Sequence, residues 1–241
     1  MPEVARSTPP LSARARLVMA FGLAFGFASV QNLAVLPALW IIAGAGVLAS
    51  GRAWQILLRL RGAAVLAGAF MLILPLIAGE TVLARLGPLV LYLEGAQAGA
   101  LIAGRLLAIV AVTLALLSPL SPFELVAGMR ALGVPALMAD LALLTLRYMD
   151  EVAAQLARAR LARRLRGGKS GWRGLPDHAL LLATSLIRAQ ARSEQLWAAM
   201  RLRGYGAGLA APAPPVSTRD WAFMTGAGVL VLAVIWVDRS L

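Results

Sequence analysis

The sequence predicts an all-α integral membrane protein with about five transmembrane helices and two long amphipathic helices on one side of the membrane. Hydrophobic residues make up 60% of the 241 residues, whereas soluble domains average about 45–50%. They are concentrated in long apolar runs, which indicate membrane-spanning helices. The net charge of +12 comes mainly from arginines between these runs, and such arginines are typical of cytoplasmic loops.

The composition excludes several classes of function. The chain contains no cysteine and one histidine, His178, so disulfides, thiolate chemistry and sites rich in Cys or His ligands for a metal are excluded. The eleven acidic residues are scattered, which argues against a carboxylate site for a hard metal. The arginines lack the interleaved aromatic residues of a surface that binds single-stranded nucleic acid. We therefore expect no catalytic residue, no metal site, no bound cofactor and no nucleic-acid partner.

Residues 1–120 are expected to contain the first four spans. The apolar run from Leu17 to Ser50 would form a helix of about 50 Å, against a hydrocarbon layer of about 30 Å. We therefore predict two short helices that turn near Gln31-Asn32. After a basic loop at 51–62, the third span is predicted from Ala63 to Ala78.

The fourth span is predicted from about Gln97 to Leu117, after a mixed segment at 79–96. It contains Arg105, and a charged side chain is costly in lipid. We therefore expect this guanidinium to face protein or water.

Residues 121–217 are predicted to form a basic region on the cytoplasmic side of the membrane, in which the helices from 121 to 147 either cross the bilayer or lie at its surface. Ser121-Pro122-Phe123-Glu124 has the pattern of a capped helix start, and that helix should stop at Gly133. A long helix should follow and end at Gly167-Gly168. A second helix is expected from Asp177 to Arg203.

The final segment, residues 218–241, is predicted to contain the last span, from Trp221 to Val237, after a proline-rich linker at Pro212–Pro215. The N-terminus, the 51–62 loop and the 121–217 region are basic. With five spans, the positive-inside rule then places the N-terminus and the basic region in the cytoplasm and the C-terminus outside. We expect a multi-pass protein of the cell (inner) membrane.

The same tetrapeptide closes both long helices: Arg164-Leu165-Arg166-Gly167 and Arg201-Leu202-Arg203-Gly204. Arginine in a last turn followed by glycine is ordinary helix-ending chemistry. A third copy, Arg59-Leu60-Arg61-Gly62, sits where positive-inside bias alone would explain it. Two such helices in tandem also suit a pair of docking points on a two-fold partner, because the planar guanidinium bonds several acceptors at once.

The segments Ala162–Gly167 and Ala199–Gly206 resemble the two Ala-Arg-Gly coupling motifs of T components. These are the transmembrane scaffold proteins of energy-coupling factor ABC importers. The flanking Leu146-Arg147-Tyr148 agrees with that family, and the second motif is most similar to the cobalt-type, CbiQ-like members. The sequence departs from the motif at its alanines, which are Leu165 and Leu202 here.

The resemblance implies a coupling scaffold for cobalt or nickel uptake, with no catalysis of its own. A T component joins a substrate-binding membrane subunit, the S component, to two ABC ATPases, which bind ATP and Mg²⁺. The implied ATPase-coupling residues are Leu165, Arg166, Gly167, Leu202, Arg203 and Gly204, supported by Arg163, Arg164, Met200 and Arg201.

Other functions remain open from the sequence. A T component for a vitamin such as biotin would have the same scaffold. A permease of another ABC importer class is disfavoured, because the spacing from Glu124 to Gly133 does not fit its Glu-Ala-Ala loop. An intramembrane enzyme would need paired acids, or a serine with a base, and the predicted spans offer little besides Arg105.

Overall fold

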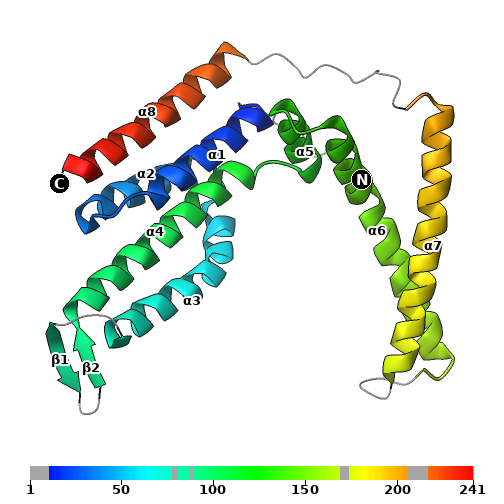
Figure 1. The fold of residues 1–241 in the computed structure, drawn as a ribbon, viewed down its shortest axis with the longest axis horizontal. Helices are drawn as coiled ribbons and strands as arrows, with labels where there is room; N and C mark the ends of the chain where they lie inside the picture. Colours follow the sequence, from blue (N-terminus) through cyan, green and yellow to red (C-terminus); the bar gives the residue numbers. More distant parts are fainter. Residues whose placement is uncertain (1–10, 78–80, 87–88, 169–173, 206–216, 241) are drawn as a thin grey trace. The chain divides into compact units, whose positions relative to one another are not determined.

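The computed structural model describes residues 11–77, 81–86, 89–168, 174–205 and 217–240 (Figure 1). The chain divides into two compact units. The first comprises Met1–Gly133 with Pro215–Leu241, and the second comprises Val134–Pro214. The functional division at residues 120 and 217 stays a prediction.

The apolar run after residue 17 forms two short helices, as predicted. Helix α1 (Ala13–Ala28) is followed by the 3-10 turn η1 (Leu33–Val35) and by α2 (Leu36–Ala49). At 1.5 Å per residue, α1 and α2 are about 24 and 21 Å long, so each is shorter than a typical hydrocarbon layer. The chain turns at Gln31-Asn32, where Asn32 precedes η1.

Helix α3 (Ala53–Ile77) begins ten residues before the predicted Ala63. The expected basic loop at 51–62 is therefore wrong, because most of it is the first part of this helix. The segment contains no proline, and the single Gly62 costs only about 1 kcal/mol inside a helix. The basic side chains Arg59 and Arg61 are exposed, which long charged side chains achieve without interrupting a helix.

A short β-hairpin interrupts the otherwise helical fold between α3 and α4. Strands β1 (Val82–Leu86) and β2 (Leu89–Tyr92) pair antiparallel, with Leu86 opposite Leu89. The all-α prediction therefore holds for the described chain except here. Helix α4 (Leu93–Leu117) starts directly after β2.

Helix α4 is the centre of the first unit and packs against α1, α2 and α3. Its buried residues are mostly small, and small residues let membrane helices approach closely. The buried apolar cluster consists of Phe27, Val30, Val35, Leu39, Ala43, Ala108, Ala111, Val112 and Val234.

The arginine in this helix faces protein, as predicted. The Nη1 atom of Arg105 donates hydrogen bonds to the carbonyl oxygens of Ala28, at 2.8 Å, and Val30, at 3.1 Å. These carbonyls lie at the C-terminal end of α1, where backbone acceptors lack partners in the helix and a cation is favoured.

Helix α5 (Pro122–Ala131) confirms the predicted helix start. The Ser121 hydroxyl accepts from the backbone N–H of Glu124 at 3.2 Å, and the Glu124 carboxylate accepts from the backbone N–H of Ser121 at 2.7 Å. Gly133, with φ +98°, lies just beyond the helix.

The last helix, α8 (Thr218–Ser240), packs on α1. Two buried aspartates, Asp220 and Asp238, bond the two ends of α8 to neighbouring backbone N–H groups. Asp220 accepts from the backbone N–H of Ser12 at 3.2 Å. The carboxylate of Asp238 accepts from the backbone N–H groups of Gln31, at 3.1 Å, and Asn32, at 2.9 Å. The two carboxylates therefore hold α8 to both ends of α1.

In the described chain, α3, α4 and α8 are long and apolar enough to cross a membrane, and Leu33–Ala49 is a shorter apolar helical segment. The length and apolar composition of these helices indicate a membrane protein. The total of about five spans stays a prediction.

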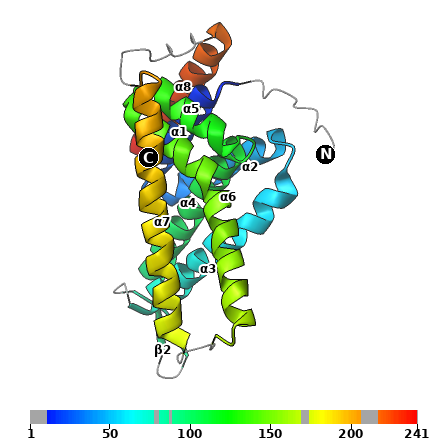
Figure 2. The same ribbon diagram turned by 90° about the vertical axis from the view of Figure 1, so that its right-hand side faces the viewer.

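The second unit contains two long helices, α6 (Ala136–Leu165) and α7 (Leu175–Leu202). Figures 1 and 2 show them running in opposite directions. The helices match the prediction closely, but α7 begins two residues before Asp177. Part of the predicted turn before Asp177 and the Pro212–Pro215 linker lie outside the described residues.

Candidate interaction site

The first Arg-Leu-Arg-Gly segment forms the C-terminal end of α6. Arg166 is the C-cap residue, and Gly167 has φ +79°, a left-handed conformation that glycine adopts without strain. The N–H of Gly167 donates to the carbonyl of Arg164 at 3.1 Å, and that of Gly168 donates to the carbonyl of Arg163 at 3.0 Å. This pair of bonds is a Schellman motif.

The second segment ends α7 with the same geometry. Arg203 is the C-cap residue, and Gly204 has φ +77°. The N–H of Gly204 donates to the carbonyl of Arg201 at 3.0 Å, and that of Tyr205 donates to the carbonyl of Met200 at 3.0 Å. We call the two ends cap 1 (residues 163–168) and cap 2 (residues 200–205).

The third copy behaves differently, because Arg59–Gly62 lies inside α3. The tetrapeptide therefore does not end a helix by itself. Helix-forming Ala63-Ala64 follows Gly62, whereas a second glycine, Gly168, follows Gly167. Helix-ending chemistry thus explains the backbone of both caps, and their exposed side chains need a separate explanation.

The leucine of each cap and the two arginines that flank it are exposed to solvent. Leu165 is 80% exposed and Leu202 is 89% exposed, more than any other large apolar side chain in the described chain. Arg166 and Arg203 are exposed beside them. Each cap therefore presents an apolar side chain flanked by two arginines, an arrangement suited to binding rather than to packing within this unit.

The structure does not bring the two caps together. His178, in the first turns of α7, contacts Arg163 of cap 1. Because 25 residues of α7 and its C-cap separate His178 from Arg203, the caps are about 37 Å apart along the helix axis. The predicted coupling residues thus form two separate sites of equal construction, one at each end of an antiparallel helix pair.

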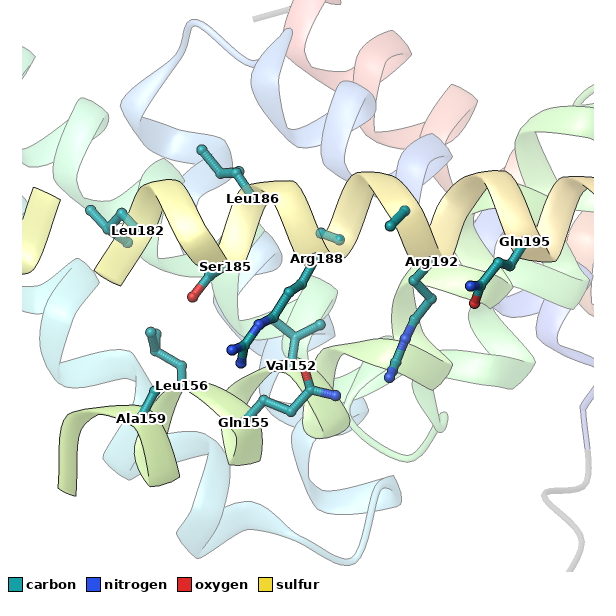
Figure 3. A pocket seen from close by; sticks show the side chains of 12 residues that line it. Val152, Gln155, Leu156, Ala159, Leu182, Ser185, Leu186, Arg188, Arg192 and Gln195 are labelled. Atoms are coloured by element: carbon teal, nitrogen blue, oxygen red, sulfur yellow. The ribbon is translucent and has the colours of Figure 1, made fainter. Parts of the chain in front are cut away.

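A groove of about 600 Å³ lies between α6 and α7. Figure 3 shows Arg188 and Arg192 reaching from α7 towards α6. Arg192 forms an ion pair with Glu151 on α6. The groove is lined by Val152, Gln155, Leu156, Ala159, Leu182, Ser185, Leu186, Arg188, Ala189, Ala191, Arg192 and Gln195.

From their apolar ridges and basic flanks, the long helices are each predicted to pack one face on protein; this stays a prediction, because the second unit itself covers neither face. Helix α7 has no buried residue, and α6 buries only Ala139. The apolar side chains Leu161 on α6 and Trp197 on α7 are 57% and 50% exposed. These faces are available to another molecule.

Sequence reasoning missed the side chains that connect the two helices. His178, in the first turns of α7, is half-buried and contacts Arg163 of α6. Tyr205 bonds Asp140, 65 positions earlier in the chain. No local pattern marks such pairs, because their partners are distant in sequence. The groove has only a weak sequence signal, the leucines Leu182 and Leu186 at i and i+4 on α7.

The described residues contain no group of three or more His, Cys, Asp or Glu side chains that could hold a metal ion. Asp238 instead bonds backbone N–H groups, and Glu151 pairs with Arg192. Each cap offers guanidinium donors and an exposed apolar side chain for contact with another molecule, and we find no catalytic constellation in the described part of the chain.

A protein-family model described as "CbiQ: Cobalt transport protein" matches residues 5–211, which is most of the chain and includes both caps. The match ends before α8. No curated protein matches the sequence.

Proposed function

Because the chain belongs to the CbiQ family of cobalt transport proteins, we propose that it is the coupling scaffold of an energy-coupling factor importer. In this role it joins a substrate-binding membrane subunit to two ATPases. The transported ion is cobalt, with nickel as the alternative. Membership of a transport family and the span-length helices support a membrane transport component; the scaffold role, the partners and the ion are our proposal.

The observation that carries the proposal is the pair of matched caps. Both long helices end in the same Schellman motif with a left-handed glycine, Gly167 or Gly204. Both expose a leucine between two arginines. Two equal docking points at a fixed separation suit a partner with two equivalent surfaces, such as a pair of identical or homologous ATPases.

The chemistry of the caps suits docking into a cleft of a soluble partner. Arg166 and Arg203 can each donate several hydrogen bonds to carbonyl or carboxylate oxygens. Leu165 and Leu202 add apolar area that is released from water on binding. Leucine replaces the alanine of the usual coupling motif, so we expect a wider pocket in the partner ATPases.

The unpartnered apolar surface of α6 and α7 supports contact with a second partner, the substrate-binding subunit. An exposed apolar surface of this extent is unusual for a helix pair that stands alone. We place the caps and the N-terminus in the cytoplasm, in line with the basic charge of this region. ATP and Mg²⁺ would be bound by the ATPases, and this chain would hold no cofactor.

The experiment tests the caps directly in the purified complex. Arg166→Ala and Arg203→Ala are combined in one chain that is co-expressed with its ATPases and substrate-binding subunit. An arginine at the centre of an interface contributes about 2 kcal/mol, so losing both should weaken ATPase binding about 10³-fold. We expect the ATPases to dissociate during purification and cobalt uptake to be lost.

The matched control is Arg59→Ala with Arg61→Ala. It removes two arginines from the same tetrapeptide inside α3, where no cap is formed. This variant should retain the ATPases. Normal ATPase retention and normal cobalt uptake in the cap variant would refute the proposed docking site.

A further inference from the structure

Packing alone does not fix the angle between α6 and α7. Helix α7 buries no residue and α6 buries only Ala139. A groove of about 600 Å³ separates the helices over part of their length. Buried apolar contacts normally set how two helices cross, so their orientation here depends on polar side-chain bonds between them.

One of these bonds lies at cap 1. The Nη1 atom of Arg163 lies 2.9 Å from Nδ1 of His178. The same Nδ1 lies 2.6 Å from the carbonyl oxygen of Gly174, the N-cap residue of α7. Nδ1 either carries the ring hydrogen and donates to the Gly174 carbonyl, or leaves the hydrogen on Nε2 and accepts from Arg163. The second tautomer ties the last turn of α6 to the first turns of α7.

A second bond lies at cap 2. The hydroxyl of Tyr205 donates to Oδ2 of Asp140 at 2.8 Å, which ties the end of α7 to the first turns of α6. The ring of Tyr205 also packs edge-on against Trp197, with centroids 6.4 Å apart. The indole holds the tyrosine in place for the bond to Asp140.

The two bonds are reciprocal. Each cap sends one side chain to the first turns of the opposite helix: Arg163 to His178, and Tyr205 to Asp140. The ion pair between Arg192 and Glu151 lies between them. Each bond therefore holds one cap to the helix that carries the other.

We infer that His178, Tyr205 and Asp140 are positioning residues that fix the separation of the two caps. This inference rests on the proposed function, in which the caps dock on two ATPases. A fixed separation makes the pair move as one body, so displacement of one cap by an ATPase is transmitted to the other. Without these two bonds, each helix would move independently with its own ATPase, and the displacement of one cap would not be transmitted to the other.

The test uses the complete complex and a chain labelled at two positions outside the caps. The sequence has no cysteine, so Leu161→Cys and Ala198→Cys give two unique spin-label sites on exposed residues. Leu161 lies near the level of residue 180 on α7, so the labels are about 27 Å apart along the axis. Double electron–electron resonance measures this distance and the width of its distribution.

The test variant combines His178→Phe and Tyr205→Phe, which remove both polar ties but keep both rings. Tyr205→Phe also keeps the aromatic contact with Trp197. The control is Tyr148→Phe, the same loss of a hydroxyl on α6, where the ring retains its contact with Arg147. His178→Asn with native Tyr205 is the conservative variant, because its side-chain oxygen can accept from Arg163.

We expect the distance distribution to broaden in the double variant and to remain narrow in the Tyr148 control. Cobalt uptake per ATP hydrolysed should fall at least about fivefold, while the ATPases still co-purify. His178→Asn should restore both readouts towards the native values. If the double variant is poorly expressed, His178→Phe and Tyr205→Phe are measured singly, and each should broaden the distribution in part.

An unchanged distribution would overturn the inference, and so would a broad distribution with unchanged uptake per ATP. Neither result would affect the proposed function, which fails instead if the cap-arginine variant keeps its ATPases. The two failures are therefore distinguishable in the same purified complex.

Discussion

The contact between α1 and α8 can be tested with a single methyl group. Gly26 on α1 faces Val231 on α8 so closely that a Cβ at Gly26 would lie 2.6 Å from Cγ1 and 2.9 Å from Cγ2 of Val231. Contacts below 3 Å require one helix to move. Gly26→Ala should therefore push α8 away from α1.

The size of the effect follows from two opposing terms. Alanine in place of glycine stabilises a helix by about 1 kcal/mol. Overpacking costs about 1–3 kcal/mol, and Val231 relieves it poorly because a β-branched side chain in a helix has one favoured rotamer. Gly22, one turn earlier on α1, has no atom within 4 Å of a built Cβ. Gly22→Ala should therefore show only the stabilising effect of alanine on the helix, without the cost of overpacking.

The assay is thermal unfolding of both variants in the same detergent. The difference in unfolding free energy between them should equal the overpacking term, about 2 kcal/mol, which corresponds to about 4–8 °C in Tm for a chain of this size. Gly26→Ala should be the less stable variant. Adding Val231→Ala to Gly26→Ala should recover part of the loss, because it removes the two methyl groups that the new Cβ meets.

Equal Tm values for Gly26→Ala and Gly22→Ala would refute the close packing of α8 on α1. A Val231→Ala change that lowers Tm equally with and without Gly26→Ala would also refute it, because the two residues would then act independently. The result bears on α8 in particular, which lies beyond the part of the chain matched by the family model.

Three further outcomes are expected. Arg105→Met removes the donor to the carbonyls of Ala28 and Val30 and should lower the unfolding free energy by about 2 kcal/mol, seen as a lower Tm than that of the native chain. The purified, untagged chain should show no specific Co²⁺ or Ni²⁺ site by isothermal titration, because its composition lacks the ligands; a micromolar site would contradict this. Cysteines at Leu165 and Leu202, labelled in the assembled complex, should lie about 35 Å apart; a disulfide between them would contradict the antiparallel arrangement.

Local chemistry made much of this fold predictable from the sequence. The start of α5 depends on Ser121 and Glu124, three positions apart, so its capping box could be read directly. The ends of α6 and α7 depend on glycines within the same short segments. The high cost of a charged side chain in lipid predicted that Arg105 faces protein or water. The sequence did not identify the two carbonyl oxygens that it binds.

The remaining features depend on residues distant in sequence or on competing local preferences. The bonds from His178 to Arg163 and from Tyr205 to Asp140 form only when α6 and α7 lie antiparallel. Gly62 has the same preceding residues as Gly167, yet α3 continues because Ala63 and its neighbours favour helix. The β-hairpin lies in a segment too short for its strand pattern to stand out from the mixed residues around it.

The two buried aspartates of α8 also constrain the surrounding lipid. Asp220 and Asp238 are 18 residues apart and bond opposite ends of α1, so the polar contacts lie about 27 Å apart along the helix. Because α1 and α8 are held together at both ends, they cannot slide past each other to match a thicker hydrocarbon layer. A thicker bilayer must instead thin around the protein or tilt it, at a fraction of a kcal/mol per Å. The length of this pair therefore sets the membrane thickness in which the first unit is least strained.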